Sequence, residues 1–295
     1  MAQNYYHISG MRLTAFMKKF GTNAACREHL ETVRWPNGPV CPHCGSGDGA
    51  GHVGGRPGLY SCWACGKQFT VTVGTPMHGS HLPLNVWYLA MYLILASSKG
   101  ISSVKLGEHL GVGQKTAWFL GHRIRGWLDS GEKLPLSGIV EADQSYVGGK
   151  ARNRRNKAPS PGKGRGTAKP MLFAAIERGG EARARPIRSA RIDDIARPLW
   201  NWTDGGAAVL CSDELASYRW IGGKMEGHHA VHHARREFAR TTRDGIRAHV
   251  NTVEGFFGLF KRAIVGVWHQ ISAKHLHRYA GEHEFRWNCR RTDVA

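Results

Sequence analysis

The stretch IVEADQSYVGGK, residues 139–150, decides the fold because it joins the composition of a buried strand to two carboxylates. The β-branched and aromatic side chains that are typical of a strand are Ile139, Val140, Tyr146 and Val147. Glu141 and Asp143 stand two positions apart, so on a strand both point to the same face as Ile139. Acids on the core face of a strand need a chemical role.

Two more acids occur in comparable places. Residues 207–213, AAVLCSD, read as a second buried strand that ends in Asp213. Residues 249–266 read as a helix whose apolar stripe is Val253, Phe257, Phe260 and Ile264. Another face of that helix carries Asn251, Glu254, Gly258 and Lys261, so Glu254 and Lys261 project in one direction.

Three acids on two strands and a helix suit a site for Mg²⁺ or Mn²⁺, which take oxygen ligands and offset the repulsion between carboxylates. Two such ions catalyse displacement at phosphorus by activating the attacking oxygen and stabilising the leaving one. Taken singly, each acid could equally be a turn or cap residue. The metal site therefore depends on the three acids converging in space.

Outward from these segments the chain alternates strand and helix signals, which predicts an α/β domain opening near Pro135. Strands are expected at 171–177 and 184–190, and a helix at 192–202 that is interrupted by Pro198. Between the first two strands lies KARNRRNKAPSPGKGRGTAKP, residues 150–170. This segment is either a solvated linker or a phosphate clamp that becomes ordered on DNA.

Four of the seven cysteines form two CxxC pairs, Cys41 with Cys44 and Cys62 with Cys65. This spacing predicts a zinc ribbon with one structural Zn²⁺, and four unliganded thiols are the alternative. Gly45 and Gly66 follow the pairs and permit tight turns there. The single cysteines Cys26, Cys211 and Cys289 are expected to pack as small hydrophobic residues.

Helical signals surround this module. A turn should precede the helix TNAACREHLETVRW, and an apolar helix should span 84–96. Next comes a helix-turn-helix pattern. It consists of a helix capped by Ser102 or Ser103, a turn at Gly111 to Gly113 and a second helix over 114–128. The expected DNA contacts are Gln114, Lys115 and Thr116, with Arg123 and Arg125 nearer the phosphates. A plain helical hairpin with a basic solvated face would show the same pattern.

The charge balance favours a polyanionic partner. The 295-residue chain carries 41 Lys and Arg against 22 Asp and Glu, a formal charge of +19. Nucleic acid is the leading candidate, and an anionic membrane surface is the alternative. The longest apolar run, 84–96, is too short to span a bilayer. Because MAQNYYHISGMRL lacks a signal-peptide pattern, we expect a cytoplasmic, nucleoid-associated protein.

Several motifs together resemble a known family: ETVRWPNGPVCPHCG, SKGISSVKLGEHLGVGQKTAW, IVEADQSYVGG, LCSDELASY and HVNTVEGFFGLFKRAIVG. They resemble the DDE-class bacterial insertion-sequence transposases of the ISXO2-like group. The resemblance implies a zinc ribbon, a helix-turn-helix and a ribonuclease-H-like mixed-sheet catalytic domain. It implies Asp143, Asp213 and Glu254 as metal ligands, and Lys261 as a catalytic residue contacting DNA. Some relatives use an Asn, here Asn251, as third ligand.

This resemblance implies the activity. The protein would bind terminal inverted repeats as a dimer or larger assembly, cleave the strand, and transfer it to target DNA. The alternatives are an inactivated or non-catalytic transposase-derived DNA-binding protein, and a nuclease that cleaves without joining. The domains would be an N-terminal helical segment (1–40), a zinc ribbon (41–80), a helix-turn-helix domain (81–134) and a catalytic domain (135–295).

Two local features remain. Gln144 and Ser145 stand where the family usually has an acid and a threonine. The His-rich segment 228–240 could bring a histidine such as His233 to the scissile phosphate or a metal, but a basic edge strand is the preferred interpretation.

Overall fold

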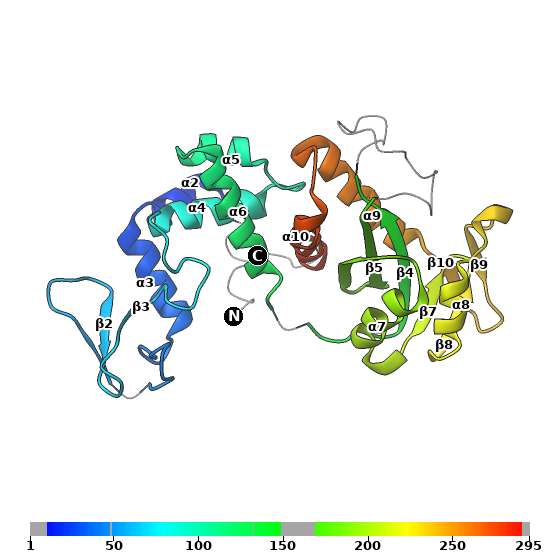
Figure 1. Cartoon of the computed structure of the whole chain (residues 1–295), viewed down its shortest axis with the longest axis horizontal. Coiled ribbons are helices and arrows are strands. Elements are labelled where there is room, and N and C mark those ends of the chain that lie inside the picture. Colours follow the sequence, from blue (N-terminus) through cyan, green and yellow to red (C-terminus); the bar gives the residue numbers. More distant parts are fainter. Residues whose placement is uncertain (1–10, 48, 132, 149–168, 291–295) are drawn as a thin grey trace. The chain divides into compact units, whose positions relative to one another are not determined.

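The computed structural model describes residues 11–47, 49–131, 133–148 and 169–290 (Figure 1). The described residues form two compact units, with the division between Trp127 and Leu128. Nearly all of the basic segment 150–170 falls outside the described residues. Among the helices that are described, none has the length and apolarity needed to cross a bilayer.

The first unit contains most of the predicted helices. They are α2 (Leu13–Phe20), α3 (Asn23–Arg34), α4 (Leu84–Ala96), α5 (Ser103–Leu110) and α6 (Gln114–Leu128). Helix α2 occupies a region that we expected to be a turn. It forms because Phe16 and Phe20, one helical turn apart, bury their rings against Tyr92 and Tyr88 of α4 at centroid distances of 4.6 and 5.2 Å.

The predicted helix pair is present as α5 and α6. Ser102 caps α5 by accepting a hydrogen bond from the Lys105 backbone N at 3.2 Å. Gly111 ends α5 with a φ of 66°, a left-handed conformation that favours glycine. Three short strands complete the unit as an antiparallel sheet in the order β1-β2-β3: β1 (Ala50–His52), β2 (Leu59–Cys62) and β3 (Gln68–Thr70).

The second unit is built on a mixed five-stranded sheet in the order β6-β5-β4-β7-β8. Its strands are β4 (Ile139–Tyr146), β5 (Met171–Glu177), β6 (Ala182–Ile187), β7 (Val209–Ser212) and β8 (Gly227–Ala230). Strands β4, β5 and β6 form an antiparallel meander, while β7 runs parallel to β4 and β8 runs parallel to β7. A separate hairpin joins β9 (Ala239–Thr241) to β10 (Arg247–His249).

Helices cover both faces of this sheet (Figure 1). They are α7 (Ile192–Trp202), α8 (Ala216–Gly222), α9 (Asn251–Ala263) and α10 (Leu276–Asn288). Alternation along β5 divides the core, since Leu172 and Ala174 pack with α9 and α10 whereas Phe173 packs with α7 and α8. The strand β4 is thus buried on both faces.

Most predicted elements of this unit are present with small shifts. The strand over 171–177 is confirmed, whereas β6 begins and ends earlier than the predicted 184–190. Helix α7 continues through Pro198, so the predicted interruption is wrong. Burial of Ile195 and Leu199 against the sheet holds the helix together despite the backbone donor that proline lacks.

Candidate functional site

The register between β4 and β7 determines where the first two acids lie. The parallel pairing runs from Ile139 opposite Val209 to Glu141 opposite Cys211, and there it ends. Continued by two residues, the same register would set Asp143 beside Asp213. Both acids thus follow the point where the strands separate, and both lie on the face that α9 covers.

Helix α9 brings the third acid to the same region. Glu254 lies in its first turn with 51% of its side chain exposed, and Lys261 follows two turns later on the exposed side. Val253, Phe256, Phe257 and Phe260 bury the opposite stripe in the core. Asn251, the alternative third ligand, is exposed at the first position of the helix.

The pKa of Asp143 reflects the charged residues that lie near it. Burial, and after it the negative charges of Asp213 and Glu254, raise the pKa of this carboxyl to about 7. A hydrogen bond from the Gln144 backbone N, at 2.7 Å, and the positive charge of Lys261 act in the opposite direction. The other three predicted catalytic residues therefore all act on Asp143 through space.

The three carboxylates do not close into a compact cluster. Where the chain is described, the four zinc-ribbon cysteines are the only group of three or more acidic, His or Cys residues with ligand atoms all within 4.8 Å of one another. The oxygen-rich donor set suits Mg²⁺ or Mn²⁺.

Gln144, the residue that follows Asp143, has a buried hydrogen-bond partner. Gln144 Oε1 accepts a 2.7 Å hydrogen bond from the hydroxyl of Tyr218, which is fully buried on α8. Burial, followed by the charges of Asp143 and Asp213, raises the pKa of Tyr218 well above its ordinary value, so this group stays a donor. The hydrogen bond from Tyr218 on α8 thus holds the Gln144 side chain in place.

The His-rich segment contributes one residue to this neighbourhood. Strand β8 is the edge strand of the sheet, as predicted for its first part, and the chain then turns. The His233 backbone N donates to Glu214 Oε2 at 3.0 Å, and its Nε2 lies 3.9 Å from Glu254 Oε1. His233 therefore lies beside the third acid.

Glu141 has a different environment from the one its spacing suggested. It points to the same face as Asp143, but it is 0% exposed and its oxygens are occupied by protein donors. The donors come from Arg178, Thr252 and Val253, and His249 Nδ1 lies 3.0 Å from Oε1. Neither Glu141 nor Arg178 was predicted as functional, because their meeting depends on tertiary contacts that no local pattern contains.

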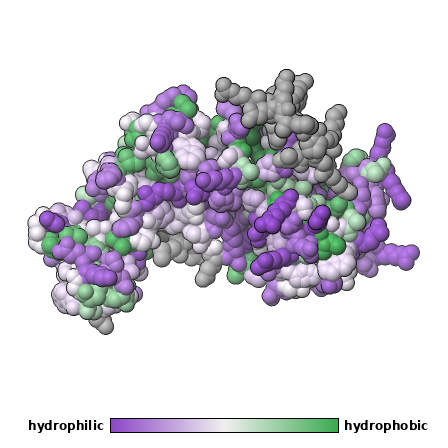
Figure 2. Space-filling model, viewed as in Figure 1, coloured by the Kyte–Doolittle hydropathy of each residue, from purple (hydrophilic) through white to green (hydrophobic). Residues whose placement is uncertain are grey.

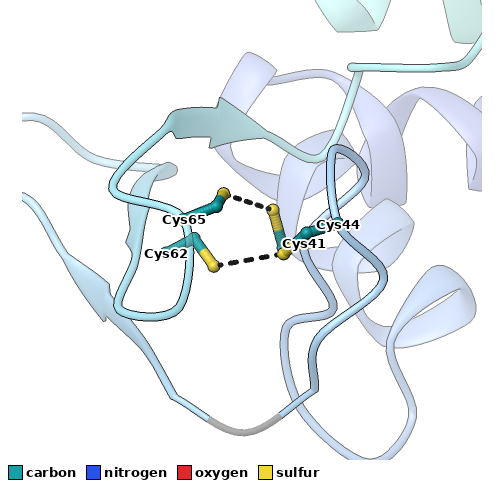
Figure 3. A group of neighbouring side chains, drawn as sticks. All are labelled: Cys41, Cys44, Cys62 and Cys65. Carbon is teal, nitrogen blue, oxygen red and sulfur yellow. Dashed lines mark hydrogen bonds between the residues drawn. The ribbon is translucent and has the colours of Figure 1, made fainter.

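The four zinc-ribbon cysteines form the second candidate site (Figure 3). The two CxxC turns are alike: Gly45 N donates to Cys41 O at 2.9 Å, and Gly66 N donates to Cys62 O at 2.8 Å. Both glycines have positive φ, at 75° and 68°. The Sγ atoms of Cys41 and Cys65 are 3.8 Å apart, and those of Cys44 and Cys62 are 3.7 Å apart.

These separations fit a zinc ion. A Zn–S bond of about 2.3 Å in a tetrahedron places sulfurs roughly 3.8 Å apart. Desolvation raises the pKa of the Cys41 thiol, but hydrogen bonds from the backbone of His43 and Cys44 and from neighbouring thiols lower it to about 6. The Ser46 backbone lowers the pKa of the Cys44 thiol, but desolvation and the other three thiols raise it to about 11. The protein alone therefore favours the thiolate at Cys41, and a bound cation would supply the charge that ionises Cys44.

The predicted DNA contacts of the helix pair differ in accessibility. Gln114, Lys115 and Thr116 are exposed at the start of α6. Arg123 is exposed and donates to the His78 carbonyl at 2.6 Å, with its guanidinium 5.1 Å from the centre of the Trp87 ring. Arg125 is 4% exposed, so its guanidinium packs within the unit.

Basic side chains also gather on the second unit. Figure 2 shows hydrophilic side chains projecting where β9 and β10 lie. The exposed arginines of this region are Arg235, Arg236, Arg240, Arg243 and Arg247. Such a group supplies the positive charge that a nucleic-acid backbone attracts.

Comparison with known families agrees with these features. A family described as ISXO2-like transposase domain matches residues 135–288, and one described as transposase zinc-ribbon domain matches residues 21–68. The chain therefore carries a transposase domain and a transposase zinc ribbon. It belongs to the ISXO2-like family, as its motifs predicted, and its cysteine cluster is a zinc ribbon that fits Zn²⁺.

One curated relative supports the assignment. It is described as an uncharacterized protein in transposable element ISH50 of Halobacterium salinarum (strain ATCC 700922 / JCM 11081 / NRC-1). The two sequences are 31% identical over 219 residues, which cover 67% of this chain and 72% of the relative. No solved structure matches the chain.

Proposed function

We propose that the second unit is a ribonuclease-H-like catalytic domain that cleaves and transfers DNA strands by a DDE mechanism. The observation that carries this proposal is the β4–β7 register, which directs Asp143 and Asp213 to the same face where the strands part. Glu254 enters from α9 and raises the pKa of Asp143. The strand order β6-β5-β4-β7-β8, with three antiparallel and two parallel strands, supports the fold assignment.

Asp143, Asp213 and Glu254 would hold Mg²⁺ or Mn²⁺, with two ions as the expected number. Glu254 is preferred to Asn251 because a carboxylate binds these cations more strongly than an amide does. When bound, the ions would activate the attacking oxygen and stabilise the leaving one. Asp143 must lose its proton to serve as a ligand, so its raised pKa predicts weaker metal binding below neutral pH.

The other residues of the region would position DNA. Lys261 is exposed two turns beyond Glu254 and would contact the phosphate backbone near the cleavage point. His233, beside Glu254, is placed to approach the same phosphate. Water would be the nucleophile in strand cleavage and a DNA 3′-hydroxyl the nucleophile in joining, so no protein-linked intermediate is needed.

The first unit would bind the terminal inverted repeats. We propose that α5 and α6 act as a helix-turn-helix, with Gln114, Lys115 and Thr116 at the major groove and Arg123 towards the phosphates. The buried Arg125 is better suited to packing. In functional terms the chain would divide into the helical segment 1–40, the zinc ribbon 41–80, the helix-turn-helix domain 81–134 and the catalytic domain 135–295.

The decisive experiment is Mn²⁺-dependent cleavage of a DNA fragment that carries the sequences flanking the gene. We expect cleavage at the element ends by the wild type, and none by Asp143→Asn, Asp213→Asn or Glu254→Gln. Each variant should bind the same fragment as tightly as the wild type, because DNA affinity comes mainly from basic residues elsewhere. Asp244→Asn, an exposed acid in the β9–β10 turn, is the matched control and should cleave normally.

Other outcomes separate the alternatives. Full cleavage by any one of the three variants would remove that residue from the triad. Binding without cleavage by the wild type would indicate a non-catalytic DNA-binding protein. Cleavage without strand joining would indicate a nuclease. Because two element ends have to be paired, we expect a dimer or larger assembly on DNA, which sedimentation of the complex measures.

A further inference from the structure

We infer that Glu141 is the positioning residue of the catalytic centre, holding the first turn of α9 so that Glu254 faces Asp143 and Asp213. This inference rests on the proposed function, because it concerns the same three acids. It assigns Glu141 a role distinct from metal binding, although Glu141 lies only two residues from Asp143 on the same face of β4.

The contacts of Glu141 are directed at the start of α9. Its Oε2 accepts hydrogen bonds from the Thr252 backbone N at 2.7 Å and from the Val253 backbone N at 3.3 Å. Its Oε1 accepts from the Thr252 hydroxyl at 2.9 Å. Glu254 is the next residue along the helix. One carboxylate thus fixes the turn that carries the third acid.

This arrangement replaces an ordinary helix cap. Val250 occupies the N-cap position of α9 and has no side chain able to accept the first amides. Glu141 supplies that acceptor from a strand more than a hundred residues earlier. A carboxylate at a helix N-terminus also interacts favourably with the helix dipole. The helix is therefore docked to β4 by a charge-assisted bond rather than by apolar packing alone.

Arg178 completes the linkage. It follows β5 directly, and its Nε donates to Glu141 Oε1 at 2.7 Å. Its other nitrogens donate to the carbonyls of Arg247 at 2.6 Å and His249 at 3.1 Å, both in β10. Glu141 and Arg178 therefore connect β4, the end of β5, β10 and the start of α9. Because the Glu141 side chain is fully buried, water does not weaken these bonds.

The charge on Glu141 is part of the inference. A glutamine of similar size offers one acceptor oxygen and one NH₂ donor. In Glu141→Gln an NH₂ group at the Oε2 position would face the Thr252 and Val253 amides, which are donors. An NH₂ group at the Oε1 position would face the donor Arg178 Nε, although His249 Nδ1 and the Thr252 hydroxyl, 3.0 and 2.9 Å from Oε1, can accept there. The first turn of α9 should then loosen, and Glu254 should lose its fixed direction while the rest of the sheet keeps its packing.

The first test measures Mn²⁺ binding by the protein, with free Mn²⁺ detected by electron paramagnetic resonance. The second measures how cleavage depends on Mn²⁺ concentration. We expect Glu141→Gln to weaken Mn²⁺ binding about tenfold or more, as substitutions behind metal ligands do. It should raise the Mn²⁺ concentration for half-maximal cleavage by the same factor. Thr252→Val, which removes only the hydroxyl contact, should show a smaller shift in the same direction.

Glu284→Gln is the matched control. Glu284 is also a buried acid of this unit, 3% exposed, but it accepts from the Ala184 backbone N at 2.8 Å and pairs with Lys133 at 2.7 Å. Its substitution should lower the melting temperature without changing Mn²⁺ affinity.

The outcomes are distinguishable. A folded Glu141→Gln protein with wild-type Mn²⁺ affinity overturns the positioning role, and so does an equal loss of affinity in Glu284→Gln. If Glu141→Gln does not fold, Thr252→Val decides, and wild-type affinity in that variant is the overturning result. Wild-type protein that binds no Mn²⁺, or Asp143→Asn that still cleaves, would instead overturn the proposed function.

Discussion

The hydroxyl of Tyr218 donates a 2.7 Å hydrogen bond to Gln144 Oε1, directly beside the acid Asp143. Gln144 also donates its backbone N to Asp143 Oδ1 at 2.7 Å. One buried tyrosine on α8 is therefore linked to the first acid through a single intervening residue. Because the side chain at this position is an amide, it adds no charge beside Asp143.

This pair allows a test by double substitution. Gln144→Leu should lower the free energy of unfolding by about 1 to 3 kcal/mol, because the fully buried Tyr218 hydroxyl loses this acceptor. Tyr218→Phe should cost less, since the partly exposed Gln144 can turn to solvent. In denaturant unfolding, the double variant should be less destabilised than the sum of the single variants. Strict additivity would mean that the hydrogen bond contributes nothing.

The raised pKa of Asp143 predicts a pH-dependent stability. Its pKa is about 7 in the folded protein, against an ordinary value of 3.8. The folded state thus keeps a proton that the unfolded chain releases, so this group lowers stability as pH rises from about 4 to about 7. At pH 8 and without metal, the free energy of unfolding of Asp143→Asn should be about 2 kcal/mol higher than that of the wild type. This value is already reduced because Asp143 is partly exposed. Thermal melts of both proteins at pH 4.5 and pH 8 give the comparison.

At pH 4.5 the gain of Asp143→Asn should be much smaller than at pH 8, because this pH lies only slightly above the ordinary pKa of 3.8 and little of the proton-linked difference has yet developed. Asp244→Asn, at an exposed turn, should show no such pH-dependent gain. Equal melting of Asp143→Asn and the wild type at pH 8 would contradict the raised pKa of Asp143.

Removal of zinc should affect the first unit selectively. The protein should contain one Zn²⁺ per chain by elemental analysis, and Cys44→Ser should lose most of it because three thiolates remain. Chelation should unfold the region of β1 to β3 and leave the sheet of the second unit folded. Cys289→Ser, far along the chain in the second unit, should keep its zinc. Full zinc content in Cys44→Ser would exclude a four-cysteine site.

The proposed helix-turn-helix predicts a salt effect. If Lys115 contacts a phosphate, Lys115→Ala should weaken DNA binding about equally for all sequences and reduce the slope of log K against log salt by about 0.9. Lys105 on α5 is the comparison, because it already pairs with Glu108 at 2.8 Å. A titration between low and moderate salt measures both slopes, and an unchanged slope for Lys115→Ala would place the DNA elsewhere.

Local patterns in the sequence predicted much of this architecture. The helix over 84–96, the helix α6 and the strand over 171–177 follow from the local pattern of apolar residues, and α5 follows also from its Ser102 cap. The CxxC spacing likewise predicted the cysteine cluster, since each pair closes its own turn. These helices, strands and turns depend on residues that are close together in the chain, so they can be predicted from a single sequence.

Long-range contacts are where the predictions fell short. Helix α2 forms because its phenylalanines meet α4, more than sixty residues away. Glu141 and Asp143 have the same spacing and face in any strand, yet one caps α9 and the other faces the second acid. Their roles differ because α9 docks on β4 beside Glu141. This contact joins residues far apart in the sequence, so no local pattern predicts it.

The shared register of β4 and β7 also sets which changes in length the chain can accept. Ile139 and Val209 are paired, and Asp143 and Asp213 each lie four residues after them. The segments 139–143 and 209–213, here called the two arms, therefore have equal length. One residue inserted in either arm would turn its acid to the opposite face of the sheet. The turn between β9 and β10 carries no such constraint. Insertions that abolish activity should therefore cluster in the two arms, whereas the hairpin can grow or shrink.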